Sequence, residues 1–176
     1  MTNPMRCCNV APFFLLATLV GCAGNGDGPS KTGQSYLLSA EPSQPLGVVE
    51  LKTSLTSGLA AEGETATIIG RVGGGQNPTW DTSQASFLLR DLKLEIQSHD
   101  HGGDHDDCKF CQAEKAKELK SMALLQVVDA NDQVVSTDAR KLLGVKEDDV
   151  IVAQGVGEVD EVGNFVFSAS KLYIRK

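Results

Sequence analysis

The chain has 176 residues, of which 41% are hydrophobic and 22% are charged, and its formal net charge is -7 at pH 7. A chain of this length has room for one domain with a leader and a linker, and its core needs no disulfide staples. The acidic balance disfavours nucleic acid and anionic lipid headgroups as partners of the folded part, because long-range electrostatics repel both. Metal ions and cationic groups are the partners that this charge favours.

The first 21 residues are predicted to be a signal peptide rather than part of the domain. Arg6 precedes an apolar run over 10–20, which is too short to span a bilayer permanently. The run ends in Leu19-Val20-Gly21-Cys22. These residues resemble the lipobox of bacterial lipoproteins, and the resemblance implies cleavage before Cys22 and lipidation of Cys22. The residues themselves also allow an ordinary secretory signal that is cut nearby.

The resemblance also implies a location. A lipidated Cys22 would hold the protein to a membrane of the cell envelope through its N-terminus, with the domain facing the periplasm or the exterior. Ala23 stands where well-studied lipoproteins that stay in the inner membrane carry an acidic residue. The resemblance therefore favours the outer membrane.

Two segments are predicted between the lipobox and the domain. Residues 22–47 are rich in Gly, Ser, Pro and Gln and poor in apolar side chains, a composition that cannot offset the entropy of ordering. We therefore expect a flexible tether there. Apolar residues then recur at helical spacing from Val48 to Leu59, which predicts a short helix over 48–63.

The remaining residues, 64–176, have the pattern of a β-rich domain. Short runs with strand character alternate with turns, and two stretches are rich in helix formers. The predicted strands are 65–72, 85–92, 123–129, 150–159 and 165–174, and the predicted helices are 112–122 and 138–143. Five strands with a small helix between the third and the fourth is the order of an OB-fold barrel. The predicted class is therefore all-β with short helices, a five-stranded OB-fold barrel preceded by a short helix.

Several stretches resemble, in order, the strand signatures of OB domains of the anticodon-binding type. They are Ile69-Gly70-Arg71-Val72, Phe87-Leu88-Leu89-Arg90-Asp91, Val127-Val128-Asp129, Gly155-Val156 after Glu147-Asp148-Asp149-Val150, and Ala169-Ser170-Lys171-Leu172. The likeness covers residues 65–176. It departs from the family in the long connection after the second strand and in the lipoprotein leader.

OB barrels commonly bind nucleic acid or sugar across the second and third strands, with aromatic stacking and a basic groove. This chain is poorly equipped for such binding, because its aromatic content is only 5% and its positive residues are scattered. The spacing of Phe87, Phe165 and Phe167 suits a barrel core better than a stacking surface. Nucleic-acid or glycan binding is therefore disfavoured.

The residues with ligand chemistry gather in one insertion, 98–111. It holds every histidine of the chain and the only cysteines after Cys22, namely His99, His101, His105, Cys108 and Cys111. Imidazole nitrogens and thiolates are ligands for zinc or copper, and two cysteines three residues apart can reach one tetrahedral ion. The pattern predicts a metal site in which both cysteines and two of the histidines bind the ion.

Two other readings of the insertion remain open. Outside the cytoplasm, Cys108 and Cys111 can form a disulfide that closes a very small loop. Alternatively, the histidines and aspartates form a solvated loop with no shared role, and Asp106 or Asp107 caps the following helix.

No catalytic arrangement is evident outside the insertion. The chain has no Ser/His/Asp set and no phosphate-binding glycine loop followed by lysine, and residues 73–75 read as a turn after the first strand. We therefore expect a binding or structural module rather than an enzyme. The alternative is a thiol-disulfide or metal-transfer protein that uses Cys108 and Cys111. The sequence does not identify a protein partner.

Overall fold

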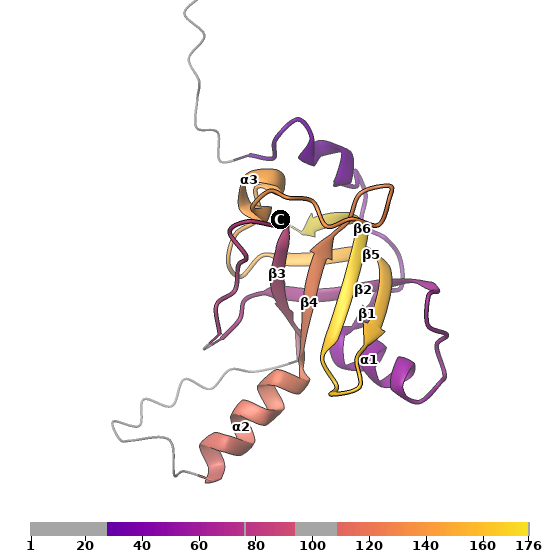
Figure 1. Ribbon diagram of the computed structural model, residues 1–176, viewed down its shortest axis with the longest axis vertical. Coiled ribbons are helices and arrows are strands. Elements are labelled where there is room, and N and C mark those ends of the chain that lie inside the picture. Colours follow the sequence, from indigo (N-terminus) through magenta and orange to yellow (C-terminus); the bar gives the residue numbers. More distant parts are fainter. Residues whose placement is uncertain (1–27, 76, 94–108, 176) are drawn as a thin grey trace, which may run out of the picture.

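Five strands close into a barrel in the computed structural model, which describes residues 28–75, 77–93 and 109–175 (Figure 1). The strands are β2 (Thr65–Val72), β3 (Ser86–Arg90), β4 (Met122–Val127), β5 (Val150–Val159) and β6 (Phe165–Arg175). Their order around the barrel is β2-β3-β4-β6-β5, and β5 pairs back onto β2. The β4–β6 pair is parallel and the other four barrel pairs are antiparallel. The predicted β-rich class and five-stranded OB-fold barrel are confirmed.

In the described residues three α-helices accompany the barrel: α1 (Val48–Thr56), α2 (Lys109–Lys120) and α3 (Ala139–Leu143). The predicted helix over 48–63 is therefore too long. The second half of α1 and the residue after it carry serines and threonines whose hydroxyls bond back to helix carbonyls, as Thr53 does to Val49 and Ser57 to Thr53. Such bonds weaken a helix, and Gly58 then takes a left-handed φ of 71° that ends it.

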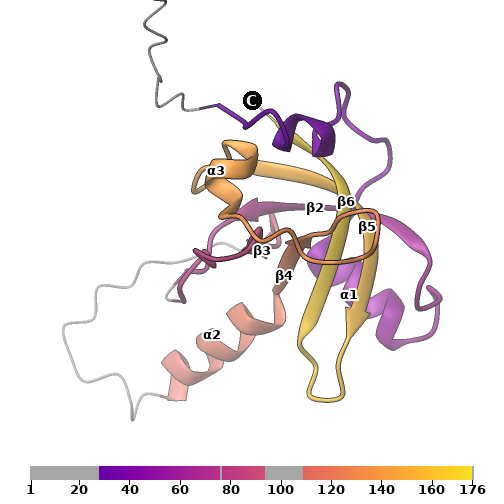
Figure 2. The same cartoon turned by 45° about the horizontal axis from the view of Figure 1, so that its top comes forward.

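The core lies inside the barrel, where alternate strand residues point inward. Its largest fully buried side chains include Phe87 on β3, Leu125 on β4, Ile151 on β5 and Phe167 on β6. The helices α1 and α3 lie at opposite ends of the barrel (Figures 1 and 2). Each adds buried apolar residues to the same core, among them Val48, Leu51, Leu142 and Leu143. The barrel is thus closed at both ends by short amphipathic helices.

The segment before α1 packs on the barrel, which corrects the predicted flexible tether over 22–47 for residues 28–47. A short 3-10 helix, η1 (Gly33–Tyr36), is followed by a backbone hydrogen bond of 2.8 Å from the Leu38 N–H to the Leu172 C=O. Strand β1 (Leu46–Gly47) then pairs in parallel with β2. Composition did not predict that residues 28–47 are ordered, because only a few apolar residues, such as Tyr36 and Leu37, pack this segment against the core. Residues 22–27 lie outside the described part.

Within the ranges that the structure describes, no helix combines the length and the apolar character needed to cross a membrane.

Gly155 permits a close approach between β5 and β6. The register of this pair shifts between Gln154 and Gly155, and a Cβ at Gly155 would lie 1.9 Å from the Ser168 carbonyl oxygen. The backbone of β6 cannot move away without breaking its pairing with β4. A side chain at Gly155 therefore strains two strand pairs at once.

We expect Gly155→Ala to lower the free energy of unfolding by about 1–3 kcal/mol, as overpacking in a core does. Urea unfolding followed by circular dichroism measures the change. Gly28→Ala is the matched control, because a Cβ at Gly28 would meet nothing within 4 Å. Equal stability of the two variants would contradict this account of the close approach between β5 and β6.

Asp138 begins α3. Its Oδ1 accepts a hydrogen bond of 2.9 Å from the Arg140 backbone N–H, and the residue is only 6% exposed. The side-chain hydrogen bonds from Arg140 hold the pKa of Asp138 below its ordinary value, although partial burial opposes this. The Arg140 guanidinium also lies over the Trp80 ring, 5.4 Å from its centroid. Asp138 thus fixes both the helix start and an arginine that packs on an aromatic ring.

We expect Asp138→Ala to lower the free energy of unfolding at neutral pH by about 1 kcal/mol. The folded-state pKa is depressed, so this contribution is present above the unfolded-state pKa of about 3.9 and disappears as the pH falls through the folded-state value. Urea unfolding at neutral pH and near pH 3 would show the difference from the unmodified protein shrinking in acid. Asp138→Asn keeps a capping oxygen and should lose less at neutral pH. A difference independent of pH would refute the role of the charge.

Candidate functional site

The predicted His/Cys site falls mostly outside the residues that the structure describes. His99, His101, His105 and Cys108 belong to the segment 94–108, and Cys22 precedes the first described residue. Cys111 is the third residue of α2. Among the described residues, no group of three or more His, Cys, Asp or Glu side chains could hold a metal ion. The metal ligands and the lipidation of Cys22 therefore stay predictions.

The structure does show how the insertion is attached to the barrel. The connection that carries it, residues 91–121, leaves the end of β3 and returns at the start of β4, where the Asp91 N–H donates a 2.9 Å hydrogen bond to the Ser121 C=O. Since β3 and β4 are antiparallel neighbours, the two ends of this connection lie side by side. The insertion 98–111 therefore belongs to a long hairpin connection whose base is fixed by the barrel.

Asp91 is the central residue of this base and is only 5% exposed. Its Oδ2 accepts a 2.9 Å hydrogen bond from the Val49 N–H, and its Oδ1 accepts one of 2.8 Å from the Lys93 N–H. Val49 lies in the first turn of α1, so Asp91 caps a helix that begins more than 40 residues earlier. Gly47 permits the approach, because a Cβ there would lie 2.9 Å from Oδ2. One carboxylate thus joins β3, α1 and the insertion.

The helix α2 extends from this base and away from the barrel (Figures 1 and 2). Its last turn carries Lys117 and Lys120, and Leu119 is 60% exposed. Burial lowers the pKa of Lys52 on α1, the nearby charge of Asp160 raises it, and the charge of Lys120 lowers it. The end of α2 therefore lies close enough to α1 for their charges to interact.

Charged residues of β2, β3 and the loop before β5 lie close together. Arg90 on β3 forms an ion pair with the Asp148 carboxylate, and Arg71 on β2 donates a 2.9 Å hydrogen bond to the Asp148 C=O. Thr79 donates one of 2.9 Å to Glu147. Both arginines are thus engaged by the chain's own loop, which reduces the positive potential that this face presents to a polyanion.

The three phenylalanines of the strands occupy the interior, as their spacing predicted. Phe87 and Phe167 are fully buried, and Phe165 is 3% exposed. Trp80 packs against Phe87 with ring centroids 5.6 Å apart. These four rings therefore belong to the core and its edge, and they do not form an exposed stacking surface for bases or sugars.

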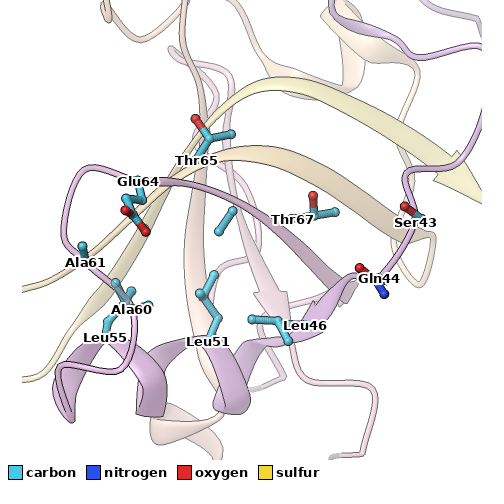
Figure 3. Close-up of a pocket in the computed structure, with 12 residues that line it drawn as sticks. Ser43, Gln44, Leu46, Leu51, Leu55, Ala60, Ala61, Glu64, Thr65 and Thr67 are labelled. Atoms are coloured by element: carbon cyan, nitrogen blue, oxygen red, sulfur yellow. The ribbon is translucent and has the colours of Figure 1, made fainter.

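A pocket of about 340 Å³ lies between α1 and the first half of β2, and no residue of the β3–β4 connection lines it (Figure 3). Leu46, Leu51 and Leu55 supply an apolar floor, and Ala60 and Ala61 form one wall. Polar residues stand on its rim: Ser43, Gln44, Glu64, Thr65 and Thr67. Its volume lies near the lower end of the range of sites that hold small molecules, and its lining combines an apolar floor with a polar rim.

The chain was compared with models of protein families, with curated proteins and with solved structures, and none of them matches it. The fold therefore stands on its own strand order and pairing. The function has to be argued from the chemistry of the residues.

Sequence reasoning missed both Asp91 and the pocket. Asp91 was noticed only as the last residue of a strand signature, although a lone carboxylate directly after a strand is a signal for a cap. The pocket carries no sequence signal, because its residues come from the N-terminal segment, α1, a loop and β2. Only the packing of these segments brings them together.

We expect Asp91→Ala to lower the free energy of unfolding by about 1–3 kcal/mol, since the N–H groups of Val49 and Lys93 lose their acceptor. Urea unfolding measures the loss, and amide exchange should speed up at Val49. Asp91→Asn keeps one acceptor oxygen and should lose less. Asp81→Ala is the control, because the Asp81 carboxylate accepts hydrogen bonds only from Ser83, two residues along the chain. If both alanine variants are equally stable, Asp91 does not hold the base.

Proposed function

We propose that this protein is a lipid-anchored module of the cell envelope, in which a five-stranded OB barrel carries a His/Cys metal-binding insertion. The metal is zinc or copper, and the ligands are Cys108, Cys111 and two of His99, His101 and His105. The observation that carries the proposal is the base of the insertion. A barrel hairpin with its ends fixed by Asp91 and Ser121 supports a long ligand-rich connection without disturbing the core.

The chemistry of the donors supports zinc or copper over calcium or magnesium. Thiolates and imidazoles are borderline or soft ligands, whereas calcium and magnesium prefer oxygen. Four protein ligands would give a closed site, which favours a structural or storage role over catalysis. The lipid anchor rests on the lipobox at residues 19–22 and places the domain outside the cytoplasm, with the outer membrane favoured.

The second candidate is a thiol-disulfide or metal-transfer protein, and the start of α2 favours it. The helix begins at Lys109, directly after Cys108 in the chain, and Cys111 lies in its first turn. Positive partial charge at a helix N-terminus lowers the pKa of nearby thiols. In such an exchange the Cys108 thiolate attacks a partner's disulfide, and Cys111 then displaces the partner. The partner leaves with both sulfurs reduced as Cys108 and Cys111 become oxidised to a disulfide.

We expect the chain, purified without a metal-affinity tag, to contain about one zinc or copper ion with both thiols protected. Elemental analysis with parallel thiol counting measures both quantities. Cys111→Ser should lose most of the metal and melt at a lower temperature, and a chelator should lower the melting temperature of the unmodified protein. Ser98→Ala, in the same stretch but without a ligand, is the control.

Two results would redirect the proposal. Absence of metal together with an oxidised Cys108–Cys111 pair would make the insertion a disulfide-closed loop. Trapping of mixed disulfides through Cys108 in the Cys111→Ser variant would favour the exchange protein. If neither metal nor exchange is found, both candidates fail.

A further inference from the structure

One edge of β2 is open beside the pocket. On one side β2 pairs with β5 along its length, from Thr65 to Arg71. On the other side it pairs with β3 at Arg71 and Val72 and with β1 at Ile68 and Ile69. In the part of the chain that the structure describes, the edge from Thr65 to Thr67 has no strand partner.

The hydrogen bonds at the end of β2 show which backbone groups face this edge. The Val72 N–H donates to Asp149 at 2.8 Å, on the β5 side, and the Gly73 N–H donates to Leu88 of β3 at 3.0 Å. Backbone groups alternate between the two sides of a strand, so the odd-numbered residues face away from β5. The N–H groups of Thr65 and Thr67 and the C=O of Thr65 therefore face the open edge, on the side of β2 where β1 lies. The parallel register of Leu46 with Ile68 uses the Thr67 C=O.

The pocket lies next to the start of β1, since Ser43, Gln44 and Leu46 are among the residues that line it. Before Leu46 the chain turns away from β2, because Gln44 takes a left-handed φ of 55° and Pro45 has no N–H. Gln44 and Ser43 stand at one end of the pocket and Glu64 at the other, with β2 above and α1 below (Figure 3). The pocket therefore has the shape of a short groove along β2, with an apolar floor.

We propose that this pocket is a strand-addition site, in which an extended segment of a partner protein pairs with Thr65 and Thr67 in line with β1. Extended backbone alone presents donors and acceptors that alternate in the same way as the open edge. An apolar side chain of the segment enters the floor formed by Leu46, Leu51 and Leu55. A basic side chain lies next to Glu64, whose carboxylate is exposed and makes no ion pair with the described residues.

This site is independent of the proposed metal insertion. None of its lining residues belongs to the insertion or to its base at Asp91 and Ser121. Loss of metal binding would leave the strand-addition site in place, and failure of peptide binding would leave the metal proposal untouched.

The test is a titration of the isotopically labelled full chain with a short acetylated peptide of alternating valine and lysine, followed by nuclear magnetic resonance. We expect saturable shifts at residues that line the pocket and slower amide exchange at Thr65 and Thr67. A fully N-methylated peptide with the same side chains should bind at least about tenfold more weakly, since it cannot donate to the open edge.

Three variants locate the binding. Thr65→Pro removes the N–H that faces the open edge, together with the Thr65 side chain, and should weaken binding by about two- to tenfold. Glu64→Gln should weaken it by about two- to fivefold, whereas Glu62→Gln, a neighbouring change outside the pocket, should not. Ala61→Trp fills the pocket without altering β2, so it tests the site even if Thr65→Pro fails to fold. Melting temperatures report whether each variant is folded.

Several outcomes would overturn the proposal. One is the absence of shifts at Thr65 and Thr67 at saturating peptide, and another is equal binding of the N-methylated peptide. Amide protection that grows with protein concentration in the absence of peptide would assign the edge to a second copy of the chain. Protection without peptide at every concentration would assign it to another segment of the same chain.

Discussion

The pairing of β2 with β5 is the constraint on which the rest of the structure depends. It closes the barrel through seven register pairs, from Thr65↔Val156 to Arg71↔Val150. Because β2 is committed to β5 along this length but meets β3 only at its last two residues, its other edge must be covered by something else. Strand β1 covers the middle of that edge, and α1 follows directly and closes the barrel end. The pocket is the part of the edge that this arrangement leaves open.

The buried carboxylate of Asp91 connects this framework to the insertion. It accepts from the first turn of α1 and from the backbone after β3, so the barrel end and the base of the insertion form one hydrogen-bonded unit. A base of this kind lets a long connection carry the His and Cys residues while the two strands keep their register. It also explains why the barrel tolerates a long connection where a tight hairpin would suffice, since loop length costs little once the ends are held.

The barrel does not by itself define a function, because OB barrels serve many. In the described residues Phe87, Phe165 and Phe167 are in the core, and Arg71 and Arg90 both contact Asp148. The proposed metal site lies in the insertion. The proposed peptide site lies on the open edge of β2, which is the edge that does not pair with β5. Under the two proposals the barrel is the rigid framework. The insertion binds a metal ion, and the open edge of β2 binds an extended peptide segment.

The sequence by itself determined the five strands and the small helix before β5, because a barrel needs a two-residue alternation that local patterns reveal. The ranges of β2 and β5 matched the prediction, since turn residues bound both strands. Residue chemistry alone also led to the proposal that His99, His101, His105, Cys108 and Cys111 are metal ligands, and this stays a prediction. The sequence could not give the packing of residues 28–47, the cap at Asp91 or the pocket. Those depend on contacts between residues far apart in the chain, which only the tertiary structure brings together.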